Sequence, residues 1–189
     1  MKAAILILAA ALCGSAAQIT AAGARVVPNV SGSPVGGVRP MRIALGTFAE
    51  LEKRFDGKLG SLGGVNNPTD LLGTTRGIYL DGYGAVFTSE MSLIVTPGIN
   101  PFRPTITDAL KAQVHQEKIA RVPKLKEAMK EMAKTAALTL LQVPDNQQIV
   151  IAVRLDYLQW EDTIGLPGLV VVKADRRSAL AGNFQVEEQ

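Results

Sequence analysis

The sequence predicts an α+β fold in which a long kinked helix packs on one face of an antiparallel sheet of about four strands, arranged as two hairpins. Three observations support this prediction. Two pairs of segments with alternating apolar residues lie on either side of one long segment with helical periodicity. Glycine and proline separate the members of each pair, as in hairpins. The domain, expected over residues 46–189, is long enough to bury one apolar core.

The first element of the domain is a helix that is expected to begin at Thr47. The Thr47 hydroxyl can accept a hydrogen bond from the amide of Glu50, whose side chain can reach back, which makes a capping box. The residues on its apolar face are Phe48, Leu51 and Phe55. Asp56 and Gly57 are expected to end the helix, and a glycine-rich loop follows from Gly57 to Gly77.

A first pair of strands follows this loop. It consists of a short strand from Ile78 to Asp81 and a longer one from Ala85 to Val95, with Gly82 and Gly84 between them. The longer strand alternates in polarity, which is typical of a half-buried sheet strand. Its inward residues are expected to be Phe87, Ser89, Met91 and Leu93.

The longest helical segment begins around Thr105 and Asp108 and runs toward Leu141. Pro123 lies inside it, and a proline removes one backbone donor and clashes with the preceding turn. We therefore expect two helical pieces or one kinked helix. Apolar residues after the proline recur at steps of three and four, which predicts an amphipathic helix lying on the sheet. They are Val122, Leu125, Met129, Met132, Ala136 and Leu140.

The second pair of strands is the clearest signal in the chain. A long strand is expected from Gln148 to Trp160, and a shorter one from Leu169 to Asp175. A turn that contains Gly165 and Gly168 joins them, so the two are predicted to form an antiparallel hairpin. Along the shorter strand the inward residues are Val170, Val172 and Ala174.

The first residues predict export. Lys2, an apolar run from Ala3 to Leu12, and small residues before Gln18 form a signal peptide over residues 1–17. A flexible leader over residues 18–45 would connect it to the domain. The mature protein is expected to be periplasmic or secreted, with no membrane span after cleavage. Cys13 could alternatively carry a lipid, although Leu12 is larger than that pattern requires.

Composition excludes several classes of function. The chain has 20 basic and 17 acidic residues, a balance that argues against binding of nucleic acid. Cys13 is the only cysteine and His115 the only histidine, so neither a thiolate site nor a transition-metal site is expected. No sequence motif indicates a cofactor. His115 lies in the long helix with no serine or aspartate at contact spacing, which predicts an exposed helical residue.

Two aromatic clusters beside turns are the candidate binding residues. Amphipathic rings next to hydrogen-bonding groups suit carbohydrate or peptide surfaces, although rings at strand ends also cap cores. The candidates are Tyr79, Asp81, Tyr83, Trp160, Glu161 and Asp162.

The sequence thus favours an exported, non-catalytic binding or envelope-associated interaction module. Its expected partners are an envelope protein, a peptide or a saccharide, and a free sheet edge could also pair with a second copy. The alternative is a cofactor-free hydrolase that uses two carboxylates, with Glu90 and Glu161 as candidates.

Overall fold

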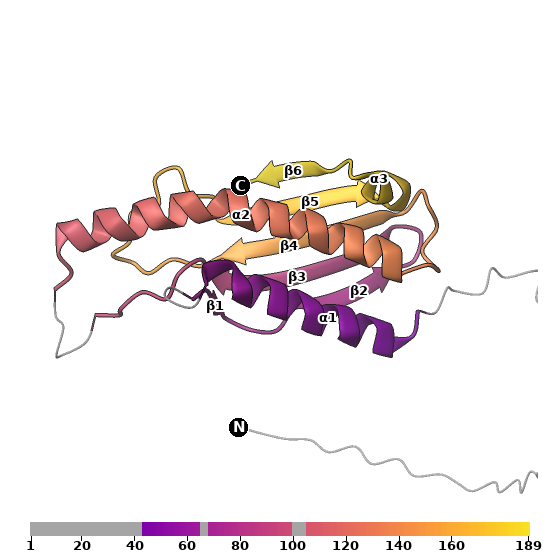
Figure 1. Cartoon of the computed structure of the whole chain (residues 1–189), viewed down its shortest axis with the longest axis horizontal. Helices are drawn as coiled ribbons and strands as arrows, with labels where there is room; N and C mark the ends of the chain where they lie inside the picture. Colours follow the sequence, from indigo (N-terminus) through magenta and orange to yellow (C-terminus); the bar gives the residue numbers. More distant parts are fainter. Residues whose placement is uncertain (1–42, 65–67, 100–104) are drawn as a thin grey trace, which may run out of the picture. The chain divides into compact units, whose positions relative to one another are not determined.

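The computed structural model describes residues 43–64, 68–99 and 105–189. The expected signal peptide, and the expected leader up to residue 42, lie outside the described residues. The elements of the described part are shown in Figure 1. Their order is α1 (Leu45–Gly60), the 3-10 turn η1 (Ser61–Gly63), β1 (Asp70–Leu71), β2 (Arg76–Leu80), β3 (Gly84–Ser92), α2 (Asp108–Thr139), β4 (Gln148–Leu155), β5 (Leu169–Asp175), α3 (Arg176–Ala181) and β6 (Gln185–Glu188).

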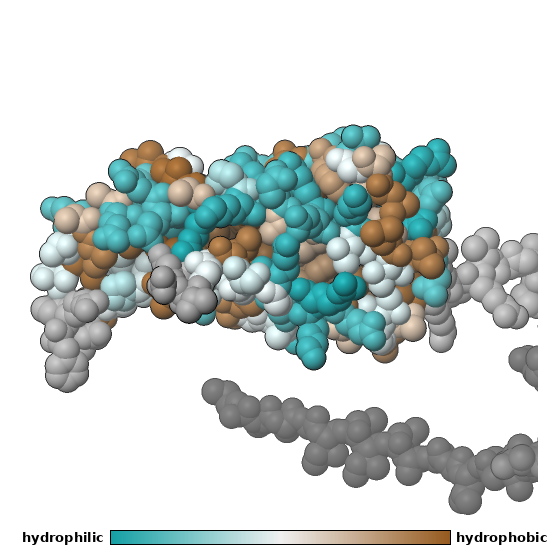
Figure 2. Space-filling view, viewed as in Figure 1, coloured by the Kyte–Doolittle hydropathy of each residue, from teal (hydrophilic) through white to brown (hydrophobic). Residues whose placement is uncertain are grey.

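These elements confirm an α+β fold with a long helix on a sheet. The described strands form a six-stranded sheet in the order β1-β3-β4-β5-β6, with β2 paired to β3 beside β1. Helix α1 lies over the side of β2 and β3, and α2 lies over β4 and β5 (Figure 1). Among the described residues, no helix covers the opposite face of the sheet, which we call the open face. Hydrophilic side chains predominate on the outer surface of α1 and α2, with separate apolar patches (Figure 2).

The sheet is mixed, and the prediction of an antiparallel four-stranded sheet was wrong in this respect. Strands β3 and β4 run parallel, from Gly84 beside Gln148 to Met91 beside Leu155. The cause is α2, whose 32 residues extend about 48 Å at 1.5 Å per residue. This length returns the chain along the whole of β3, so β4 begins at the same end of the sheet as β3, as in a crossover between parallel strands.

Helix α1 begins earlier and ends later than predicted. It begins at Leu45 after Ala44, which makes no side-chain capping bond, so the expected Thr47 capping box does not form. It continues past Gly57 to Gly60, because Leu59 is fully buried in the core.

Carboxylates of α1 bind the outer side of β2 and the residue before it. Glu52 Oε1 accepts the Gly77 amide at 2.7 Å, and Asp56 Oδ1 accepts the Thr75 amide at 2.7 Å and its hydroxyl at 2.6 Å. The two acids are one helical turn apart and their partners are two strand residues apart, so the spacings match. An exposed strand edge is a site for unwanted pairing, and these bonds satisfy some of its backbone donors.

The predicted Gly57 to Gly77 loop is partly regular in the structure. It contains η1, β1 and the start of β2.

Helix α2 passes through Pro123 as one helix rather than two. The proline lies on the exposed side of the helix, where its ring does not displace the sheet. Thr107 caps the first turn by accepting the Leu110 amide at 3.3 Å. All six predicted apolar positions of α2 and its C-terminal end are buried, which confirms the amphipathic pattern. No helix of the described ranges is long and apolar enough to cross a bilayer.

The predicted hairpin of β4 and β5 is confirmed, with Ile151 beside Val172 in antiparallel register. Strand β4 ends at Leu155 rather than Trp160, because Tyr157 turns away and donates its hydroxyl to the Pro167 carbonyl at 2.7 Å. Helix α3 and strand β6 at the C-terminus were not predicted.

Candidate functional site

The β2–β3 turn and the C-terminal end of β4 lie at opposite ends of the sheet (Figure 1), and each is flanked by one of the two predicted aromatic clusters. Tyr79, Asp81 and Tyr83 surround the turn between β2 and β3, at the end where β4 begins. Trp160 and its neighbours follow the far end of β4. The six predicted residues therefore do not form one surface.

Within the first cluster, Tyr83 faces a cavity. Tyr79 packs against the core and donates its hydroxyl to Gln147 Oε1 at 2.9 Å, so it caps the core. Asp81 is exposed in the turn. The Tyr83 side chain is 45% exposed and lines a cavity of about 470 Å³.

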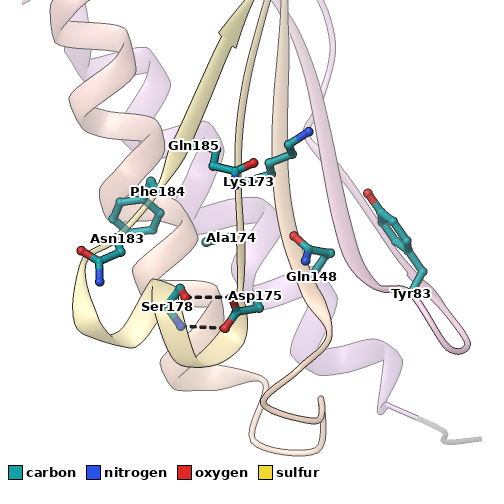
Figure 3. A pocket seen from close by; sticks show the side chains of 9 residues that line it. All are labelled: Tyr83, Gln148, Lys173, Ala174, Asp175, Ser178, Asn183, Phe184 and Gln185. Carbon is teal, nitrogen blue, oxygen red and sulfur yellow. Dashed lines mark hydrogen bonds between the residues drawn. The ribbon is translucent and has the colours of Figure 1, made fainter.

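This cavity, which we call the turn-end cavity, is the candidate site (Figure 3). Tyr83 stands on one side, Asn183 and Phe184 stand on the other, and Gln148 and Asp175 lie between them. Its volume falls within the range of about 300–1,000 Å³ that is typical of small-molecule sites. The lining residues are Tyr83, Gln148, Lys173, Ala174, Asp175, Ser178, Asn183, Phe184 and Gln185.

A close backbone approach fixes Tyr83 beside Gln148. Gly84 pairs with Gln148 across the two strands, and the Gln148 amide donates to the Tyr83 carbonyl at 2.8 Å. Gly84 has φ +135°, and a Cβ there would lie 2.0 Å from the Gln148 carbonyl oxygen. Only glycine fits this position, so the turn is tied to the first residue of β4.

Both charged side chains of the cavity have internal partners. Asp175 caps α3 by accepting the Ser178 amide at 2.9 Å and its hydroxyl at 2.7 Å, and these bonds lower the pKa of Asp175. Lys173 Nζ lies 2.5 Å from Glu187 Oε1 on β6. This hydrogen bond and the charge of Glu187 raise the pKa of Lys173.

Unlike the two charged side chains, the three primary amides of the cavity have no internal partner among the described residues. The side chains of Gln148, Asn183 and Gln185 make no hydrogen bond to another described residue. Each primary amide offers two N–H donors and one carbonyl acceptor. The cavity therefore combines an exposed phenol and a second aromatic ring with three amides that are available to a ligand.

In the second predicted cluster, Glu161 is a buried anchor. Glu161 forms an ion pair with Lys118 of α2, and both side chains are 1% exposed. Thr96 donates its hydroxyl to Glu161 Oε1 at 2.8 Å, Lys118 Nζ donates to Ser92 Oγ at 3.2 Å, and the same nitrogen lies 4.8 Å from the Tyr157 ring centre. These contacts fasten the loop after β4 to the start of α2.

The neighbouring residues of this loop also have local roles. Asp162 Oδ1 accepts the Ile164 amide at 3.0 Å, and the Asp162 carbonyl lies 2.9 Å from His115 Nδ1. Trp160 is half-buried, and its indole nitrogen is buried without a hydrogen-bond partner in the described part of the chain.

The carboxylates proposed for the hydrolase alternative have basic neighbours. Glu161 pairs with Lys118 inside the protein, whereas Glu90 lies on the open face with its Oε1 3.6 Å from Arg154 Nε. The described residues contain no group of three or more His, Cys, Asp or Glu side chains that could hold a metal ion.

Comparison with known proteins finds no family model, no curated protein and no solved structure that matches this chain.

Tyr157 makes the fold sensitive to high pH. Burial, with a further contribution from the Glu161 charge, raises the pKa of Tyr157 from 10.0 to about 12. A phenol whose pKa is higher in the folded state stabilises the fold below its unfolded pKa and loses this effect as the pH rises through the folded value. We expect the melting temperature to fall between about pH 10 and 12, and to fall less in a Tyr157→Phe variant. Circular dichroism melts of both proteins test this, and equal falls would contradict it.

Proposed function

We propose that this protein is an exported, non-catalytic binding module whose ligand occupies the turn-end cavity. One observation carries the proposal. An exposed aromatic ring and three primary amides without described partners converge on a cavity of about 470 Å³. Binding sites typically combine apolar and aromatic surface with a few convergent polar groups, and this cavity has that composition.

The surroundings of the cavity support binding rather than catalysis. Its one carboxylate, Asp175, is used on both oxygens by Ser178, and its one amine, Lys173, is held by Glu187. Neither group is poised to exchange a proton with a ligand, because each is engaged in its charged form. Export is supported by the signal-peptide pattern of residues 1–17, and places the proposed partner in the periplasm or outside the cell.

The first test measures ligand capture by the mature protein. The protein is immobilised and exposed to an extract of envelope and secreted material, and bound peptides and saccharides are identified by mass spectrometry. We expect one compound class to be retained, and its retention to fall at least about ten-fold in Tyr83→Ala, since exposed aromatic anchors dominate many binding sites. Ile164→Ala is the matched control, because Ile164 is an exposed apolar residue of the loop at the opposite end of the sheet.

Three results would count against the proposal. Equal retention by the wild type and Tyr83→Ala would exclude the turn-end cavity. Conversion of a retained compound to a product would contradict a non-catalytic role. Recovery of the full chain only from the cytoplasm, with its first residues still attached, would contradict export.

A further inference from the structure

We propose that the ligand of the turn-end cavity is an uncharged saccharide. This inference rests on the proposed function and names its ligand class. Four properties of the cavity point to this ligand class: the balance of its charges, the chemistry of its free polar groups, its aromatic residues, and its position relative to the sheet edge.

The charges of the cavity call for no counter-charge on the ligand. Lys173 is paired with Glu187, and the Asp175 carboxylate accepts both the Ser178 amide and hydroxyl. A ligand that carried a phosphate or a carboxylate would compete with Glu187 for the amine. A cationic ligand would compete with Ser178 for the carboxylate. Both charges of the cavity are thus balanced within the protein, and an uncharged ligand leaves these contacts in place.

The free polar groups match sugar hydroxyls. A hydroxyl both donates and accepts hydrogen bonds, and a primary amide does the same. Gln148 stands between Tyr83 and the α3 side of the cavity, whereas Asn183 and Gln185 come from the segment after α3 (Figure 3). Amides from separate elements could therefore bind hydroxyls at different positions of a sugar ring.

The aromatic residues supply the apolar part of such a site. Tyr83 presents a ring that is 45% exposed, and Phe184 is partly buried against the core behind the cavity. A sugar ring has C–H groups on its faces that can pack on an aromatic ring, and the tyrosine hydroxyl remains available as a polar group.

A peptide fits this position less well. An extended peptide gains its affinity by adding a strand to a free sheet edge. In the described sheet the last strand on this side is β6, so the edge open to such pairing is the outer side of β6, whereas the turn-end cavity is lined by side chains. A ligand in the cavity lies against side chains rather than against unpaired strand backbone, which favours a compact polyhydroxylated molecule.

The test is NMR titration of the ¹⁵N-labelled mature protein. The neutral probes are di- and trisaccharides of glucose, galactose, mannose and N-acetylglucosamine. The comparison probes are a sulfated disaccharide and a tripeptide that is acetylated and amidated at its ends. We expect a neutral saccharide to shift the side-chain amide signals of Gln148, Asn183 and Gln185. Its affinity should change less than about two-fold between about 0.05 and 0.5 M salt, since screening acts on charged partners.

Three variants separate the contributions of the site. Gln148→Ala removes hydrogen bonds and should weaken binding by about five- to ten-fold. Tyr83→Phe keeps the ring and should weaken it less than Tyr83→Ala. Glu187→Gln releases the Lys173 amine, so affinity for the sulfated disaccharide should rise while affinity for the neutral saccharide stays unchanged. Each variant is checked for folding by its amide spectrum.

The outcomes separate this inference from the proposed function. A neutral saccharide that binds and depends on Gln148 and Tyr83 supports it. Preferential binding of the sulfated disaccharide or the capped tripeptide at the same residues overturns the saccharide inference but leaves the binding module. Absence of any shift in the cavity signals with every neutral saccharide also overturns it, and the capture experiment then decides the binding module separately.

Discussion

A Lys118→Met variant is expected to lose about 3–5 kcal/mol of unfolding free energy, because it leaves a buried carboxylate without its counter-ion. Lys118 and Glu161 are both 1% exposed, so water cannot replace the missing charge. Methionine has nearly the same length and shape as the lysine stem. The loss should therefore report the unpaired Glu161 rather than a cavity.

A double-mutant cycle isolates the pair. The variant Lys118→Met/Glu161→Met removes both charges, and it should be more stable than Lys118→Met alone, since burying two apolar groups avoids the desolvation of an isolated ion. Urea denaturation followed by circular dichroism gives the free energy of unfolding of the four proteins: the wild type, Lys118→Met, Glu161→Met and the double variant. If the double variant is no more stable than the single one, the ion pair does not couple the two residues.

An exposed pair provides the control. Lys126 Nζ lies 2.5 Å from Glu188 Oε1, and the two side chains are 24% and 44% exposed. Lys126→Met should cost about 0–1 kcal/mol, as surface pairs usually do. A similar loss for Lys118→Met would mean that the buried pair behaves like a surface pair.

The position of Lys118 could have been found from the sequence. Val114, Lys118 and Val122 recur every four residues on the buried face of α2, so the lysine occupies a position where the pattern requires an apolar residue. The other charges of this region are interspersed along the helix and indicate a solvated face. A charged residue inside an apolar stripe predicts a buried partner, although the helix pattern alone cannot identify Glu161 as that partner.

The local elements were predictable because their signals are local. The alternation that buries Phe87 and Met91, and that which buries Val170 and Val172, depends only on the strand itself. Strand direction is different, because the same alternation fits a parallel and an antiparallel neighbour. The parallel pairing of β3 and β4 depends on the path of α2 across the sheet.

Strand direction also determines how far apart the two candidate aromatic clusters lie. If β4 ran antiparallel to β3, its far end would lie beside the β2–β3 turn, and Trp160 could approach Tyr83. In the parallel arrangement the β2–β3 turn, which contains Tyr83, and the C-terminal end of β4, which precedes Trp160, lie at opposite ends of the sheet (Figure 1). Tyr83 was found because it is an aromatic residue beside a turn. Gln148, Asn183 and Gln185 were missed because isolated amides form no motif, and only the fold brings them together.

Gly84→Ala is expected to destabilise the protein by about 3 kcal/mol or more, through steric clash combined with backbone strain. The added Cβ would lie 2.0 Å from the backbone oxygen of Gln148, and φ +135° is unfavourable for any residue with a Cβ. The oxygen belongs to the paired strand, so relief requires β3 and β4 to separate at their first residues. Thermal and urea unfolding measure the loss.

Gly82→Ala separates the two causes. Gly82 also has a positive φ, of +76°, but its added Cβ would meet no atom within 4 Å. It should lose only the conformational cost of about 1–2 kcal/mol. Gly84 pairs with Gln148 and allows the Gln148 amide to reach the Tyr83 carbonyl, so it sets the position of both residues in the cavity. Under conditions where both variants are folded, Gly84→Ala should therefore bind the ligand more weakly than Gly82→Ala. Equal stability and equal binding of the two variants would mean that the approach of the turn to β4 does not shape the cavity.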